Sequence, residues 1–215
     1  MLIPTVLVGL VLAMLWWGRH RILAAAGSLL IAEDPVGQVD VLVVSGASTV
    51  LGTVEVARLY REGVAPRILV PRWPPRDIDD EARRLDASYV DPETRVRGIL
   101  ERAGVPEEAI VTLPIAIDGT DLEAATVAGF VRDHGLKSLL IVTARTHGAR
   151  VRWLLRRALP PDVSLRVRSP RADPFSPGQW WLIREQSREV VMEYLRWMNV
   201  LLLGDPWARH PPRGS

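Results

Sequence analysis

The stretch Ser138-Leu139-Leu140-Ile141-Val142-Thr143 decides the fold, and it runs directly into the polar segment Ala144 to Arg150. An unbroken apolar run between polar residues indicates a strand buried on both faces, as strands in the middle of a parallel sheet are. Parallel neighbours need a crossover connection between them, which is usually a helix. The stretch therefore predicts an α/β domain with polar residues at the carboxyl end of a central strand.

Short β-rich runs alternate with longer amphipathic segments around this strand, which is typical of βα units and a mostly parallel sheet. Strands are expected at residues 39–44, 67–70, 109–113, 138–143 and 163–167. Helices are expected at 49–62, 92–104, 120–134 and 147–159, with one or two over 180–203. Residues 71–91 are rich in proline and charge and predict a long loop. We expect one domain over 33–203 and a disordered tail over 204–215.

The composition is that of an ordinary globular protein. Of the 215 residues, 48% are apolar and 24% are charged, which argues against wholesale disorder. The absence of cysteine excludes disulfides and thiolate chemistry. Lys137 is the only lysine, so the positive charge is on arginines, which bind phosphates and carboxylates well but also follow from a GC-rich genome. No metal-binding motif is present, and the sequence identifies no cofactor.

The amino terminus predicts a membrane anchor. Leu2 to Trp17 is apolar apart from Thr5, and it approaches the roughly 17 residues needed to cross a bilayer. The segment ends in two tryptophans, and the basic cluster 19–21 follows, as at a membrane interface. A cleaved signal peptide and a buried core helix are the alternatives. We predict a transmembrane anchor and juxtamembrane segment over 1–32, in which Ile22 to Ala32 packs on the domain or lies along the membrane.

Three segments far apart in the chain are expected to meet at the carboxyl edge of the sheet, where ligands bind in such folds. They are Ser45-Gly46-Ala47-Ser48, Asp118 to Glu123, and Thr143 to Arg150. In the third, His147 and Arg150 are three residues apart and share a helix face. This arrangement predicts an imidazole acting as acid or base beside an arginine that neutralises an anion. A solvated helix start with a surface histidine is the alternative.

The other two segments have structural alternatives of their own. The small residues Ser45 and Gly46 let backbone N–H groups approach an anion, but a tight strand-to-helix turn also needs them. Thr120 and Glu123 have the spacing of a capping box as well as of two ligand contacts. Glu93 is interpreted as a catalytic base, as an acceptor for a ligand hydroxyl, or as a carboxylate favoured by a helix amino terminus.

Two further patterns concern possible partners. Arginines recur between Arg150 and Arg171 and are opposed only by Asp162, which indicates a solvated face, with anionic lipid or nucleic acid as alternatives. No nucleic-acid motif accompanies them, so no nucleic-acid partner is expected. Apolar residues at helical spacing over 190–202 indicate core, with the membrane interface as a second interpretation.

Thr143 to Arg150 resembles the T-S-x-x-H-x-x-R motif of the bacterial DUF218 family, also called the ElyC/SanA/YdcF family. Gly119 to Ala124 is similar to the T-x-x-N/E-A element of the same family, with Glu123 where asparagine is commoner. The resemblance covers about residues 33–203 and includes the opening Glu33-Asp34-Pro35. It departs at Val70 to Pro75, where the family usually has a Ser-Gly-Gly turn.

The resemblance implies a Rossmann-like, doubly wound α/β fold and a role in cell-envelope or peptidoglycan-related biogenesis. It places the domain outside the cytoplasmic membrane, whereas the positive-inside rule alone would keep it inside. We expect a single-pass inner-membrane protein that acts, as a hydrolase or transferase, on an anionic or phosphorylated, lipid-linked precursor. The alternatives are a non-catalytic module that binds a nucleotide or S-adenosylmethionine-type ligand, and a scaffold. The expected site residues are His147 and Glu93 for catalysis, and Ser45, Gly46, Thr120, Glu123, Thr143, Arg145 and Arg150 for ligand binding.

Overall fold

The sheet has five parallel strands in the order β3-β2-β1-β4-β5. A computed structural model describes residues 2–47, 50–74, 77–86 and 88–203, without the side chains of 2–15, 77, 78, 83 and 203. The strands are β1 (Val41–Val44), β2 (Ile68–Arg72), β3 (Ile110–Ala116), β4 (Ser138–Val142) and β5 (Ser164–Arg168). The chain adds β2 and β3 on one side of β1 and then returns to place β4 on the other. The fold is therefore Rossmann-like, with its topological switch point between β1 and β4.

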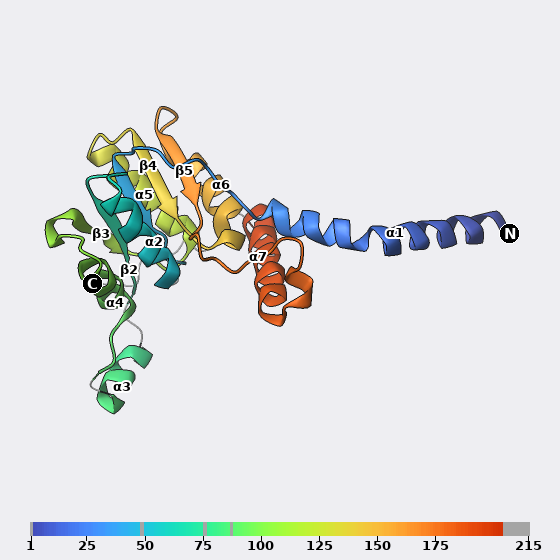
Figure 1. Cartoon of the computed structure of the whole chain (residues 1–215), viewed down its shortest axis with the longest axis horizontal. Coiled ribbons are helices and arrows are strands. Elements are labelled where there is room, and N and C mark those ends of the chain that lie inside the picture. The colour runs from blue at the N-terminus through green and yellow to red at the C-terminus, as the bar shows by residue number, and fades with distance from the viewer. Residues whose placement is uncertain (1, 48–49, 75–76, 87, 204–215) are drawn as a thin grey trace.

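Helices cover both faces of the sheet (Figure 1). On one face, α2 (Val50–Arg61) and α4 (Pro92–Arg102) share a core with alternate strand residues. On the other, α5 (Thr120–Asp133) and α6 (Gly148–Ala158) do the same. Residues 139–142 of β4 are all 0% exposed and divide alternately between the two cores. The prediction of a central strand buried on both faces is confirmed.

The predicted long loop over 71–91 contains the end of a strand and a helix. β2 continues to Arg72, and Pro71 is accommodated at a register shift against β3, a position where a missing N–H is tolerated. A helix, α3 (Asp77–Leu85), then forms and projects from the domain (Figure 1). Acidic residues crowd its first turn, where the helix dipole favours negative charge. The hydroxyl of Tyr89 donates to Asp79 Oδ1 at 2.6 Å and ties the segment back on itself.

One continuous helix, α1 (Leu2–Leu29), begins the chain and extends away from the domain (Figure 1). It is longer than the predicted span Leu2 to Trp17 and includes part of the juxtamembrane segment. Its last turns pack on η3 (Trp180–Leu182) and α7 (Arg184–Leu203), where Trp180 Nε1 donates to Leu23 O at 2.8 Å and Tyr194 Oη donates to Ala26 O at 2.7 Å. The prediction that residues 22–32 pack on the domain is thus confirmed.

Other predictions fall on parts that the structure leaves out. Within the part of the chain that the structure describes, no helix is both long enough and apolar enough to cross a bilayer. The side chains of the predicted span, Leu2 to Trp17, lie mostly outside the described residues, as do Ser48, Thr49 and the tail 204–215.

Gly148 allows α6 to begin directly against the chain that leaves α1. A Cβ at this position would lie 2.9 Å from Ala32 N and 3.1 Å from Ala32 O, and backbone atoms cannot move aside cheaply. Gly148→Ala is therefore expected to lower the free energy of unfolding by about 1–3 kcal/mol in urea denaturation. Gly129→Ala within α5 is the control, because its nearest neighbour is the flexible Arg132 side chain at 3.7 Å. Equal free energies of unfolding for the two variants would contradict the tight contact between Gly148 and Ala32.

Candidate functional site

A cavity of about 630 Å³ lies at the carboxyl ends of the strands, beside the switch point. Its wall brings together the three segments expected from the sequence and adds residues of α7, together with Trp73, Pro74 and Pro92. The residues that line the cavity include Gly46, Asp118, Thr120, Glu123, His147, Arg150, Glu189, Glu193 and Arg196. The expected convergence of the three segments is therefore observed.

His147 is the centre of a buried polar cluster. It is 5% exposed, because the short helix η2 (Arg145–His147) turns it inward after β4. Its Nδ1 lies 3.2 Å from Glu193 Oε1 and 2.9 Å from Arg150 Nη2, and its Nε2 lies 3.3 Å from Thr120 Oγ1. The interpretation of His147 as a surface residue on a solvated helix start is wrong.

The two contacts of Nδ1 require different protonation states of that nitrogen. A guanidinium can only donate, and a carboxylate can only accept. When Nδ1 carries the proton it donates to Glu193, and the lone pair of Nε2 faces Thr120 and the cavity. When Nδ1 accepts from Arg150, Nε2 carries the proton instead. The two neutral tautomers therefore present either a base or a donor at Nε2.

The charges of this cluster are set by burial and by Arg150. Burial lowers the pKa of His147, outweighing the raising effect of Glu193, so the imidazole is neutral near pH 7. Burial would raise the pKa of Glu193, but its hydrogen bonds with His147 and Arg150 lower that pKa to about 2. Arg150 Nε donates to Glu193 Oε1 at 2.6 Å, which holds the carboxylate as an anion. Glu193 thus orients a neutral histidine.

Glu123 is a second buried acid on the cavity wall. Its Oε1 accepts the backbone N–H of Gly46 at 2.7 Å, and Ser45 Oγ lies 3.4 Å from its Oε2. Burial raises the pKa of Glu123 to about 7, against the opposing effects of the Gly46 N–H, the Ser45 hydroxyl and Arg150. The carboxyl therefore exchanges its proton near neutral pH.

This pKa predicts a pH dependence of stability. Because the folded chain binds the proton of Glu123 more tightly than the unfolded chain, the stabilisation is complete below pH 4.5 and is lost as the pH rises through about 7. Its size is on the order of 3 kcal/mol. Urea denaturation across this range should show that Glu123→Gln removes this loss of stability with rising pH and that Glu108→Gln, at an exposed site, retains it. An unchanged slope in Glu123→Gln would mean that the carboxyl titrates normally.

The capping-box interpretation of Thr120 and Glu123 is wrong. Gly119 is the N-cap of α5 and has no side-chain capping bond, whereas Thr120 reaches His147 and Glu123 reaches Gly46. Gly119 takes φ +144°, a conformation that favours glycine, and so turns the chain into α5 at the cavity. Both side chains therefore serve the site.

Arg145, which was expected to bind a ligand, is not among the residues that line the cavity. Its backbone N–H donates to Asp173 Oδ2 at 2.9 Å, and its Nη1 donates to Phe175 O at 3.2 Å. Its Nε lies 3.4 Å from Ser169 Oγ. These bonds tie Arg145 to the loop after β5.

Three other predicted residues do not line the cavity. Thr143 is fully buried, and its Oγ1 has no hydrogen-bond partner among the described residues. Ser45 is also fully buried; its Oγ lies 3.4 Å from Glu123 Oε2 and accepts the backbone N–H of Ala47 at 3.4 Å. Glu93 follows the N-terminal Pro92 of α4, and its Oε2 lies 4.0 Å from Arg72 Nε. Of the interpretations given for Glu93, the helix-terminus carboxylate fits this position best.

Glu193 and Arg196, which α7 contributes, were not among the site residues expected from the sequence. Arg196 Nη1 lies 3.3 Å from Glu193 Oε2, and the Arg196 side chain is 55% exposed. In the sequence, Glu193 is the only charged residue between Val190 and Leu195, and a charge inside such an apolar stretch needs a partner if the helix is buried there. Arg150, Arg196 and Glu193 together carry one net positive charge, and Asp118, Glu123 and Glu189 add acidic side chains to the same wall.

The described residues contain no group of three or more histidine and acidic side chains placed to hold a metal ion. Comparison of the chain with protein families, with curated proteins and with solved structures finds no match.

Proposed function

We propose that this chain is a membrane-anchored enzyme that performs acid–base chemistry on an anionic, phosphorylated ligand in the cavity. The observation that carries the proposal is the position of His147, whose Nε2 faces the cavity beside Thr120 while its Nδ1 contacts the buried Glu193. Positioning of this kind, with a base oriented by a third group, is typical of general acid–base catalysis.

The proton-transfer roles follow from the two environments. His147, neutral near pH 7, removes a proton from a water or hydroxyl nucleophile through Nε2. Glu123, with a pKa of about 7, donates its proton to the leaving oxygen. Two titratable groups whose environments shift their pKa values in opposite directions are the usual mark of an acid and base pair. A hydrolase or a transferase can use this pair.

Recognition of an anion falls to groups other than Arg150, whose charge is matched by Glu193. Arg196 contacts Glu193 through Nη1 and has more than half of its side chain exposed, so it can also bind an incoming anion. The first turn of α5 adds backbone N–H groups beside Thr120. Asp118 and Glu189 add carboxylates that suit ligand hydroxyl groups.

The cellular setting remains that implied by the resemblance to the DUF218 family: an envelope protein with its domain outside the cytoplasmic membrane. The ligand class in that setting is a lipid-linked precursor. A reporter fused after Ser215 tests the orientation, because a reporter active only in the cytoplasm should stay silent.

The enzyme proposal is tested by comparing how much ligand two variants retain through purification. His147→Gln should block turnover but preserve the cavity, so that a phosphorylated molecule co-purifies and is detected by mass spectrometry. Arg196→Ala should retain less of it. Release of phosphate from a polyprenyl diphosphate by the wild-type protein then tests turnover. Retained molecules without an anionic group would contradict the proposal.

A ligand-binding module without turnover is the second candidate. It is favoured by the 2.9 Å contact between Arg150 Nη2 and His147 Nδ1, which suits the tautomer with a proton on Nε2, a donor and not a base. In that case Arg150→Ala should weaken ligand retention, whereas His147→Gln should bind and behave as the wild type does.

A further inference from the structure

The outer face of α7 carries an exposed apolar stripe. Val191, Leu195, Met198 and Leu202 follow one another at intervals of four, three and four residues, which places them in one line along the helix. Each is between 48% and 76% exposed. Large apolar side chains grouped in this way mark a surface that another phase or molecule covers.

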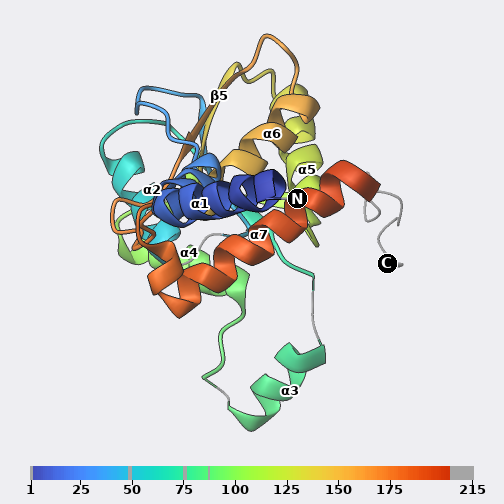
Figure 2. The same ribbon diagram turned by 90° about the vertical axis from the view of Figure 1, so that its right-hand side faces the viewer.

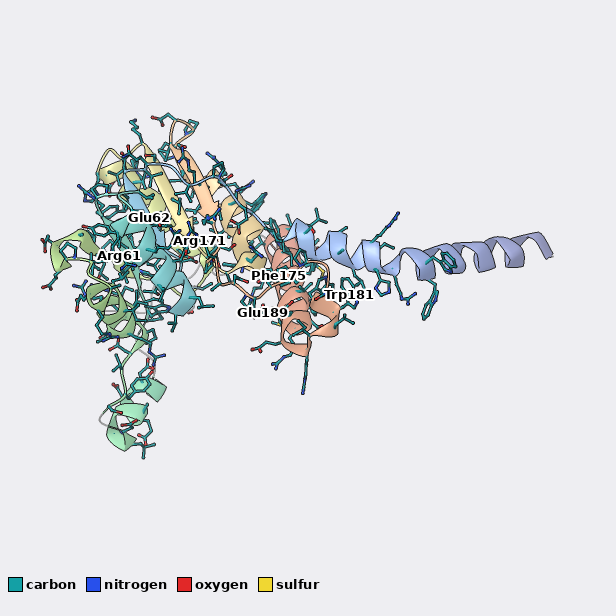
Figure 3. All side chains as sticks on the ribbon, viewed as in Figure 1. Arg61, Glu62, Arg171, Phe175, Trp181 and Glu189 are labelled. Carbon is teal, nitrogen blue, oxygen red and sulfur yellow. The ribbon has the colours of Figure 1, made fainter. Side chains whose placement is uncertain are left out.

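The opposite side of the same helix belongs to the cavity. Glu189, Glu193 and Arg196 also follow at helical spacing, and all three line the cavity. Figure 3 shows Glu189 on the side of the η3–α7 segment away from α1, whereas Trp181 lies beside α1. The stripe is therefore separated from the site by the thickness of one helix.

The helix α7 lies across the end of α1. Figure 1 shows α1 leaving the domain beside α7, and Figure 2, viewed from the α1 side, shows α7 running across the base of α1. The ring of His20 on α1 lies 5.6 Å from that of Trp181. If α1 crosses a bilayer, α7 lies at the surface of that bilayer and parallel to it.

The neighbouring residues suit a lipid headgroup region. Leu182 and Ile183, which directly precede α7, are 72% and 43% exposed. Arg184 and Arg188 continue the line of the stripe toward the amino end and are exposed. On α1, the exposed Trp16 and Trp17 stand just before the basic cluster 19–21 in the sequence. Apolar residues flanked by arginine and tryptophan are typical of helices that lie in an interface.

We propose that α7 is an interfacial helix whose outer stripe lies in the membrane surface while its inner face supplies Glu193 and Arg196 to the cavity. The proposal rests on the proposed membrane anchor and adds to it a second, lateral contact. One helix then links the lipid surface to the site, which holds the cavity close to a lipid-linked ligand.

The test uses full-length single-cysteine variants, which are clean because the chain contains no cysteine. Each variant carries an environment-sensitive fluorophore and is placed in vesicles of phosphatidylethanolamine and phosphatidylglycerol. Labels at Leu195→Cys and Met198→Cys should emit at shorter wavelength and be quenched by nitroxide-bearing lipid. Val54→Cys, an equally exposed apolar position on α2, is the matched control and should remain in water.

A label at Gly9→Cys separates the two proposals. Quenching at Gly9 without quenching at Leu195 would overturn the interfacial helix and leave the anchor standing. Absence of quenching at Gly9 would overturn the anchor itself. A Leu195 label that is shielded from water but not quenched by lipid would mean that a protein, such as a second copy of this chain, covers the stripe.

Discussion

His147→Ala should lower turnover by roughly 10²–10⁴-fold, the usual contribution of a positioned acid or base. The variant removes the imidazole whose Nε2 contacts Thr120 Oγ1 at the cavity. The contact with Glu193 is lost, but the free energy of unfolding should change too little to account for the loss of turnover. Turnover and urea denaturation are measured on the same preparations.

His134→Ala is the matched control for this experiment. His134 lies just past the carboxyl end of α5, is exposed, and contacts Phe130 O through Nδ1 at 2.9 Å. Its removal should leave turnover unchanged. If His147→Ala retained full turnover, or lost activity only in proportion to its stability, the catalytic role of His147 would be wrong.

Glu193→Ala should cause the largest loss of stability, about 3–5 kcal/mol, because it leaves Arg150 buried without its counter-ion. Arg150 is 6% exposed, and its Nε and Nη2 both contact Glu193. The variant also removes the carboxylate that orients His147, so turnover should fall with stability. Denaturant unfolding gives the first effect, and turnover at a temperature where the variant remains folded gives the second.

A double variant separates the buried charge from the contact itself. Arg150→Met with Glu193→Leu removes both partners and should be less destabilised than Glu193→Ala, since no buried charge remains unpaired. It should nevertheless remain inactive, because the imidazole has lost its orienting carboxylate. Equal destabilisation of the single and double variants would show that packing, and not the charge, determines the loss.

Several features could be predicted from the sequence because they depend on local pattern. The apolar run 139–142 has one stable environment, the inside of a parallel sheet, and this placed His147 and Gly46 at the same edge. Pro92 and Gly104 marked the ends of α4 through their backbone preferences. The side chain of Arg145, in contrast, was misplaced, since a long guanidinium can point toward either of two loops that are distant in sequence.

The amino-acid pattern by itself determined the sheet, its order of βα units and the edge at which a site could form, because burial periodicity depends on near neighbours. Only the tertiary structure decided that Glu193, 46 residues beyond His147, completes the site, and that Thr120 and Glu123 face it and do not cap a helix. A buried charge needs a partner, but nothing local specifies which residue provides it. That choice depends on how α7 packs against the sheet edge.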